Sequence, residues 1–162
     1  MGETGKTRTR QPPATYPLAV SGEFGRVLVV DDNRVIRQLI RVNLELEGFE
    51  VVTAADGVEC LEVVHDAAPD VITLDVVMPR LDGLRTAALL RADPRTRDLP
   101  LALISAGLQH EAEAAHRAGA DAFLAKPFDP ADLVSLVRRL AGAHPRAAAV
   151  RRPVEPGRSR RC

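Results

Sequence analysis

The sequence predicts a single α/β domain built on an open, doubly wound sheet of five parallel strands in the order 2-1-3-4-5. Its 162 residues contain five short runs that are apolar at every position, and each run is followed by a helical pattern. Continuous apolar runs indicate strands covered on both faces, and strands joined by helices form parallel sheets with right-handed crossovers. Five such units are too few for an eight-stranded barrel, which leaves the open sheet.

Each predicted strand is an apolar run closed by a polar or structure-breaking residue. Val30 is followed by two aspartates, and the third and fourth runs end at Asp75 and Ser105. The run before Lys126 is closed by the Lys126–Pro127 pair. We expect the strands at residues 27–30, 51–54, 71–74, 101–104 and 122–125.

Five helical patterns separate these runs, and most have recognisable ends. Gly48 and Gly119 end the first and fourth as C-caps, and Asp82 begins the third as an N-cap. The first has more apolar residues than one buried stripe needs, so Ile36 or Ile40 faces either a partner or, as the simpler interpretation, the core. We expect the helices at residues 33–47, 58–67, 82–92, 111–118 and 129–141.

The formal net charge is zero, but the charge is unevenly distributed along the chain. Residues 26–142 hold 13 basic and 19 acidic side chains, whereas residues 143–162 hold six and one. We therefore expect one domain at 26–142, a flexible N-terminal tail at 1–25 and a disordered, basic, Pro/Arg-rich tail at 143–162. A solvated C-terminal tail is the simpler interpretation, and contact with nucleic acid is the alternative.

The composition argues against several classes of protein. Zero net charge does not fit a uniformly basic nucleic-acid coat, and 3% aromatic residues do not fit a stacking platform for single strands. Cys60 and Cys162 form neither a metal-binding spacing nor a disulfide framework, which fits a reducing cytoplasm. The chain begins without the apolar segment of a signal peptide and has no run of 18 apolar residues, so we expect no membrane insertion.

Polar side chains stand at the carboxyl ends of four predicted strands. They are Asp31 and Asp32 after the first, Asp75 after the third, Ser105 after the fourth and Lys126 after the fifth. Ligands of such sheets bind at this edge, so we expect these side chains to converge. Three neighbouring carboxylates repel one another unless a cation enters, and an oxygen-only donor set favours Mg²⁺ over Zn²⁺.

The same residues supply the chemistry of an aspartyl phosphate. That chemistry uses an aspartate nucleophile, a hard cation, a lysine and a hydroxyl group. The chain has only two lysines, Lys6 and Lys126, against 20 arginines. A compact ammonium suits a phosphoryl oxygen in a tight cleft better than a planar guanidinium, which singles out Lys126.

Four stretches of this sequence resemble the receiver domain of two-component response regulators. They are VVDDN at 29–33, LDVVMPRLDG at 74–83, LISA at 103–106 and GADAFLAKPF at 119–128. Ser105 lies 30 residues beyond Asp75 and Lys126 a further 21, so the stretches match as a set. The resemblance covers residues 26–142 and implies a flavodoxin-like (receiver) fold in a stand-alone phosphorelay response regulator.

The resemblance also implies a role for each residue at the strand ends. Asp75 is expected to be the phosphoacceptor, and Lys126 to act with it in the transfer. Ser105, Lys126 and Phe123 are expected to sense the phosphoryl group, although Phe123 serves equally well as plain core. The implied ligands of Mg²⁺, or of Mn²⁺, are Asp31 (directly or through water), Asp32, Asp75 and the backbone carbonyl of Val77.

Three further positions follow from the same resemblance. The peptide bond before Pro127 is expected to be cis. Val77 and Gly107 occupy the two positions that tune the lifetime of the phosphoryl group in the family. Because neither side chain can position an attacking water, we expect self-dephosphorylation to be slow.

The implied partners are a histidine kinase or histidine phosphotransfer protein as donor, and a downstream protein on the face of the fourth helix, fifth strand and fifth helix. A receiver-like interaction module that works without phosphorylation is the main alternative.

Two other classes fit the sequence less well. A histidine phosphotransfer protein acting through His65 or His116 would need a helical bundle, which the five strand patterns argue against. An aspartate-nucleophile phosphatase would need a D-x-D motif after the first strand, where this chain has Asp31, Asp32 and Asn33. Because only 20 residues follow residue 142, we expect no output domain in them.

Overall fold

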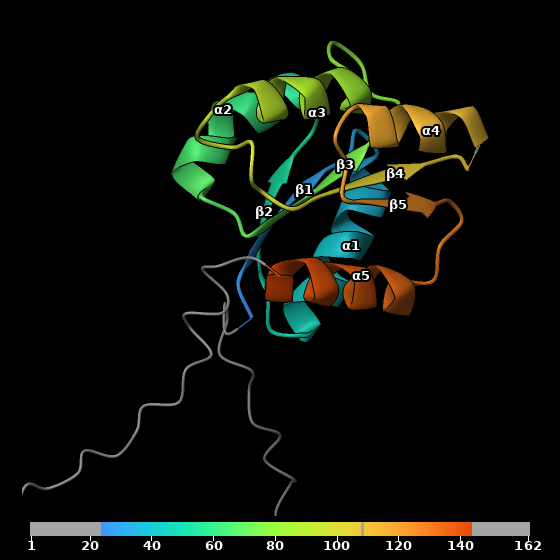
Figure 1. The fold of residues 1–162 in the computed structure, drawn as a ribbon. Coiled ribbons are helices and arrows are strands. Elements are labelled where there is room, and N and C mark those ends of the chain that lie inside the picture. Colours follow the sequence, from blue (N-terminus) through green and yellow to red (C-terminus); the bar gives the residue numbers. More distant parts are fainter. Residues whose placement is uncertain (1–23, 108, 144–162) are drawn as a thin grey trace, which may run out of the picture.

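The computed structural model describes residues 24–107 and 109–143 of the chain. Strands and helices alternate along this part from β1 to α5 (Figure 1). The elements are β1 (Arg26–Val30), α1 (Arg34–Leu46), β2 (Glu50–Ala54), α2 (Gly57–Ala67), β3 (Val71–Asp75), α3 (Gly83–Ala92), β4 (Leu101–Ser105), α4 (Gln109–Arg117), β5 (Ala122–Ala125) and α5 (Pro130–Ala143).

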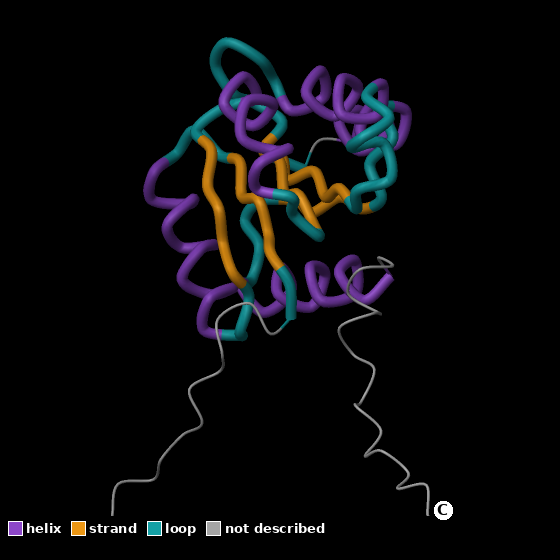
Figure 2. The backbone as a smooth tube through the Cα atoms, turned by 90° about the vertical axis from the view of Figure 1, so that its left-hand side faces the viewer, coloured by secondary structure: helices purple, strands orange, loops and turns teal. Residues whose placement is uncertain are grey.

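The strands form one parallel sheet in the order β2-β1-β3-β4-β5, which confirms the predicted fold class. Helices α1 and α5 cover one face, and α2, α3 and α4 cover the other (Figure 1). The sheet is seen between these two helical layers from the side in Figure 2. The strand order reverses between β1 and β3, and this is where open sheets of this kind bind ligands.

Successive residues of each central strand enter two different cores. Val27 and Val29 of β1 pack in the core beneath α1 and α5, whereas Leu28 and Val30 pack in the core beneath α2 and α3. All four side chains are at most 1% exposed. The two-sided burial explains why the strands are apolar at every position, because side chains alternate between the faces of a strand.

The structure corrects several predicted boundaries and one predicted environment. Helix α4 begins at Gln109 rather than 111, and α2 begins at Gly57 rather than 58. Phe24, expected in the N-terminal tail, packs against Phe49 with the ring centres 6.0 Å apart. Ile40 is buried in the core, which confirms the core interpretation for this residue, whereas Ile36 packs against the core but is only half-buried.

The remainder of the two predicted tails, residues 1–23 and 144–162, lies outside the described residues. Within residues 24–107 and 109–143, no helix has both the length and the apolar character that crossing a bilayer requires.

Candidate functional site

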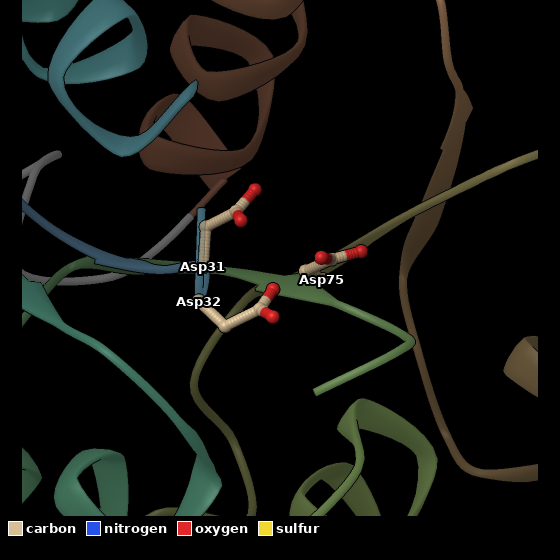
Figure 3. A group of neighbouring side chains, drawn as sticks. All are labelled: Asp31, Asp32 and Asp75. Carbon is tan, nitrogen blue, oxygen red and sulfur yellow. The ribbon is translucent and has the colours of Figure 1, made fainter. Parts of the chain in front are cut away.

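The sheet brings three carboxylates together at its carboxyl edge. Asp31 and Asp32 directly follow β1, and Asp75 ends the neighbouring strand β3. Figure 3 shows Asp31 and Asp32 side by side, with the Asp32 carboxylate reaching toward Asp75. One carboxylate oxygen from each residue lies within 4.8 Å of the others. We call these three residues the acidic cluster.

The two aspartates after β1 have different surroundings. Asp31 is 1% exposed, and its Oδ1 accepts a hydrogen bond from the Asn33 backbone N–H at 2.8 Å. Asp32 is exposed. The N-cap of α1 is Asn33, whose side chain accepts hydrogen bonds from Val35 and Ile36. Asn33, and not Asp32, therefore caps the helix, and the Asp32 carboxylate is exposed to solvent.

Lys126 supplies the positive charge beside the acidic cluster. Its Nζ lies 3.3 Å from Oδ2 of Asp31 and 3.4 Å from Oδ2 of Asp75. The peptide bond between Lys126 and Pro127 is cis. The side chain therefore joins β5, at one edge of the sheet, to the ends of β1 and β3.

Asp75 is the most strongly perturbed carboxyl group of this edge. Burial, followed by repulsion from Asp31, raises its pKa from 3.8 to about 6, while Lys126 opposes the increase. At neutral pH the group is still ionised, but it lies close to its titration range. A poorly solvated carboxylate of this kind gains more than an exposed one from a cation or from a covalent bond that removes its charge.

Ser105 ends β4 next to Asp75 and is buried. Its hydroxyl donates a hydrogen bond to Oε2 of Glu111 on α4, a contact that no motif in the sequence indicates. Phe123, on β5 opposite Leu103, is half-buried against the core beneath α2, α3 and α4. Gly107 follows β4 with a φ of 88°, a conformation that suits glycine.

The loop between β3 and α3 carries Val77, whose side chain is 69% exposed. Its neighbours Val76 and Met78 are buried on either side. Further along the loop, Arg80 pairs with Asp56 at the start of α2. This pair could not be predicted from the sequence, because its residues are 24 positions apart.

The acidic cluster fits Mg²⁺ by the chemistry of its donors. Its donors are carboxylate oxygens with no histidine or cysteine among them. Hard divalent cations prefer such oxygen ligands, and Mg²⁺ is commonly held by one or two carboxylates, leaving positions for water and phosphate oxygens. Neutralising three nearby carboxylates would also remove the repulsion that contributes to the raised pKa of Asp75.

Comparison with known families decides the class of protein. The family model of the response regulator receiver domain matches residues 27–138. The chain belongs to this family. The match includes the acidic cluster, Ser105 and Lys126.

Curated relatives of this receiver protein include longer response regulators. The response regulator MprA of Mycobacterium ulcerans is 43% identical over 116 residues, which are 71% of this chain and 49% of that protein. The DNA-binding dual master transcriptional regulator RpaA of Synechocystis is 36% identical over 116 residues, 71% of this chain and 48% of that protein. The receiver chain thus spans about half the length of these relatives.

Solved receiver structures share its fold. The chemotaxis protein CheY4 of Vibrio cholerae has a TM-score of 0.68 at 32% identity, over 75% of this chain and 99% of that one. The receiver domain of a Pseudomonas aeruginosa sensor histidine kinase has a TM-score of 0.69 at 32% identity, over 74% of this chain and 98% of that one. The Pseudomonas structure has a magnesium ion coordinated in its active site cleft.

Proposed function

We propose that this chain is a phosphorelay response regulator, which takes a phosphoryl group from a phosphohistidine onto Asp75 and thereby changes its affinity for a partner. One observation carries the proposal: the buried Asp75 carboxylate lies within 4.8 Å of two further carboxylates and 3.4 Å from the Lys126 ammonium, in a chain of the receiver family. This combination is what aspartyl phosphate chemistry requires.

The residues proposed to hold Mg²⁺ are Asp32, Asp75 and the backbone carbonyl of Val77, with Asp31 bound directly or through water. Mn²⁺ has similar ligand preferences and should substitute for it. When bound, the ion neutralises charge on the phosphoryl oxygens and on the cluster.

Asp75 is the nucleophile in the proposed transfer. A carboxylate oxygen attacks phosphorus, the phosphorus–nitrogen bond of the donor breaks, and the departing imidazole keeps the electron pair and takes a proton from solvent. Lys126 lies within reach to neutralise a phosphoryl oxygen, because its ammonium already contacts the Asp75 carboxylate. The same contact opposes the effect of burial on the pKa of Asp75 and helps to keep the nucleophile ionised.

Ser105 and Phe123 are proposed to convert phosphorylation into a change of surface. In this structure the Ser105 hydroxyl donates to Glu111. A phosphoryl group on Asp75 offers a stronger, doubly charged acceptor on the neighbouring strand, so Ser105 would change partners. Helix α4 would lose a contact to β4, the Phe123 ring would move inward, and the face of α4, β5 and α5 would repack for a downstream protein.

Slow self-dephosphorylation is part of the same proposal. The exposed side chain of Val77 is apolar, and Gly107 has no side chain. Neither can hold a water in line for attack on phosphorus. We expect the phosphorylated protein to decay over minutes or longer in Mg²⁺, and a half-life of seconds would contradict this part.

The donor protein is proposed to dock beside Lys126. A cavity of about 440 Å³ opens there, lined by Ile36, Leu39, Ala106, Lys126, Pro127 and Phe128. Val35 and Leu39 leave apolar side chains exposed on the adjoining part of α1. An apolar surface next to the nucleophile suits a helical phosphohistidine protein, whose histidine must come within bonding distance of Asp75.

Incubation of the full chain with acetyl phosphate and Mg²⁺, followed by mass spectrometry, tests the proposal. We expect one phosphoryl group on the unaltered protein and on the Asp66→Ala control, an exposed aspartate of α2, but none on Asp75→Ala. The modification should survive acid but not base or hydroxylamine, which distinguishes an acyl phosphate from a phosphohistidine. Absence of any Asp75-dependent mass gain would favour the phosphorylation-independent interaction module.

A further inference from the structure

Arg80 has an unusual backbone conformation in the loop that follows the phosphoacceptor. Its φ is 65°, and the Leu81 N–H donates a hydrogen bond to the Pro79 carbonyl across it at 2.7 Å. A three-residue turn centred on a positive φ is rare and strained for a residue with a side chain. Such a conformation persists only where surrounding contacts hold it.

The Arg80 side chain, although 59% exposed, makes a paired interaction with Asp56. Nε of Arg80 donates to Oδ2 of Asp56 at 2.7 Å, and a terminal guanidinium nitrogen lies 2.5 Å from the same oxygen. The other carboxylate oxygen, Oδ1, accepts the Glu59 N–H at 2.9 Å and so caps α2. Asp56 is 6% exposed, which makes it a fixed anchor rather than a mobile surface charge.

The rest of the loop is attached to the sheet and to α3. The Val76 N–H donates to the Ile104 carbonyl at 2.9 Å, and the Gly83 N–H donates to the Val76 carbonyl at 2.8 Å. The Met78 side chain is buried. Val77 therefore lies between two anchored residues, Val76 and Met78. Arg80 is the residue with strained backbone in the segment between Met78 and the start of α3.

We propose that the Arg80–Asp56 pair is a positioning device for the metal site, holding the β3–α3 loop in the conformation that offers the Val77 carbonyl to Mg²⁺. This inference rests on the proposed function, because it assumes that the acidic cluster binds Mg²⁺. It assigns a role to two residues that do not touch the cluster themselves.

A positioning role and a simple charge effect predict opposite results for Arg80. Removing a cation from the loop that follows Asp75 should strengthen the binding of Mg²⁺, because like charges repel one another. Releasing a strained loop that carries a metal ligand should weaken it, because the ligand must then be ordered on binding. The sign of the change in Mg²⁺ affinity therefore separates the two effects.

The test is calorimetric titration of the full chain with MgCl₂ at fixed ionic strength and neutral pH. The variants are Arg80→Ala, Asp56→Asn, which keeps the N-cap of α2, and the double substitution. Arg85→Ala is the control, because it removes an equal charge from an exposed side chain on the first turn of α3. We expect Arg80→Ala and Asp56→Asn each to weaken Mg²⁺ binding about tenfold, as loss of an outer-shell partner does.

The double variant should bind no more weakly than the single ones, because both substitutions break one contact. The Mg²⁺-induced rise in Tm should shrink in parallel, whereas a merely structural role would lower the Tm equally with and without Mg²⁺. Unchanged or tighter binding by Arg80→Ala, or additive losses in the double variant, would overturn the positioning role alone. If the unaltered protein bound no Mg²⁺, the proposed metal site would fall as well.

Discussion

At the scale of single residues, the central feature is one aspartate kept in an unfavourable environment. Burial and the neighbouring Asp31 raise the pKa of Asp75 to about 6, and Lys126 offsets only part of this effect. Above that pH the folded protein carries a charge that the unfolded chain solvates better. The fold therefore tolerates a cost at Asp75 that the proposed cation or phosphoryl group would relieve.

Replacing this aspartate with a neutral isostere should stabilise the metal-free protein. A carboxyl group with a raised pKa in the folded state favours folding when protonated and disfavours it when ionised, so its cost grows between pH 3.8 and about 6 and is complete above that. Asp75→Asn should raise the free energy of unfolding at pH 7.5 by on the order of 3 kcal/mol, and by far less at pH 4.

Urea denaturation at the two pH values, without divalent cations, measures this difference. The control is Asp66→Asn, which should change the stability little at either pH. An Asp75→Asn variant that was no more stable at pH 7.5 than at pH 4, relative to the unaltered protein, would show that Asp75 is not strained in this way.

Lys126 gives a prediction with two opposite parts. Its ammonium contacts both Asp31 and Asp75, so Lys126→Ala removes a cation that competes with Mg²⁺. We expect Mg²⁺ to bind at least severalfold more tightly, because like charges at this range repel strongly. Phosphorylation by acetyl phosphate should nevertheless fall by about 100-fold, because the phosphoryl oxygens lose their protein cation. Titration and mass spectrometry on one preparation check both parts, and a fall in both quantities would point to misfolding.

At the scale of elements, the site depends on how closely α3 approaches the end of β3. Gly83 begins α3, and a Cβ atom there would overlap the backbone carbonyl oxygen of Asp75. A hydrogen bond from the Gly83 N–H to the Val76 carbonyl holds the start of α3 in this position. Glycine is needed here for space, since a side chain would push the start of the helix away from Asp75.

Gly83→Ala should therefore destabilise the protein, although alanine is the better helix former. We expect a loss of about 2 kcal/mol, typical of overpacking against atoms that cannot move aside. Gly142→Ala is the matched control, because Gly142 is exposed in the last turn of α5 and should tolerate or favour alanine. Chemical denaturation of both variants checks this, and equal stabilities would show that α3 shifts freely.

The elements and the acidic cluster were predictable from the sequence, whereas the contacts around the cluster were not. Neighbouring parallel strands end at one edge, so polar residues directly after apolar runs, such as Asp31 and Asp75, must converge. The Arg80–Asp56 and Ser105–Glu111 contacts depend instead on how helix ends pack against loops. In the sequence alone, each of these residues is equally well explained as part of a turn or as an ordinary surface charge. The positive φ of Arg80 could not be predicted either, because arginine has no preference for this backbone conformation.

At the scale of the whole molecule, the sheet separates two cores that share the same strands. Because every central strand contributes to both cores, neither core can be lost without the other. The domain should unfold as one cooperative unit, and a ligand bound at the strand ends should stabilise all of it.

Mg²⁺ should accordingly raise the Tm of the whole domain in a concentration-dependent way. At a concentration a hundredfold above the Kd, the expected gain is about 2.7 kcal/mol, or on the order of 10 °C in Tm. Differential scanning calorimetry with MgCl₂, compared with NaCl of equal ionic strength, measures the shift, and EDTA should reverse it. Asp32→Asn should lose most of it, and a shift that survived in this variant would place the ion elsewhere.

The contact between Lys126 and Asp31 spans 95 positions of the chain, which has a consequence for biosynthesis. A ribosome synthesises the residues of β1 and β3 well before those that follow β5. A nascent chain can therefore bring the carboxylates of the acidic cluster together before Lys126 has been added. A shorter intermediate that has formed this cluster lacks the lysine that contacts Asp31 and Asp75 in the complete domain. The last strand completes the hydrogen-bonded sheet and delivers the neutralising charge, so translation must pass Lys126 before the nascent domain reaches its full stability.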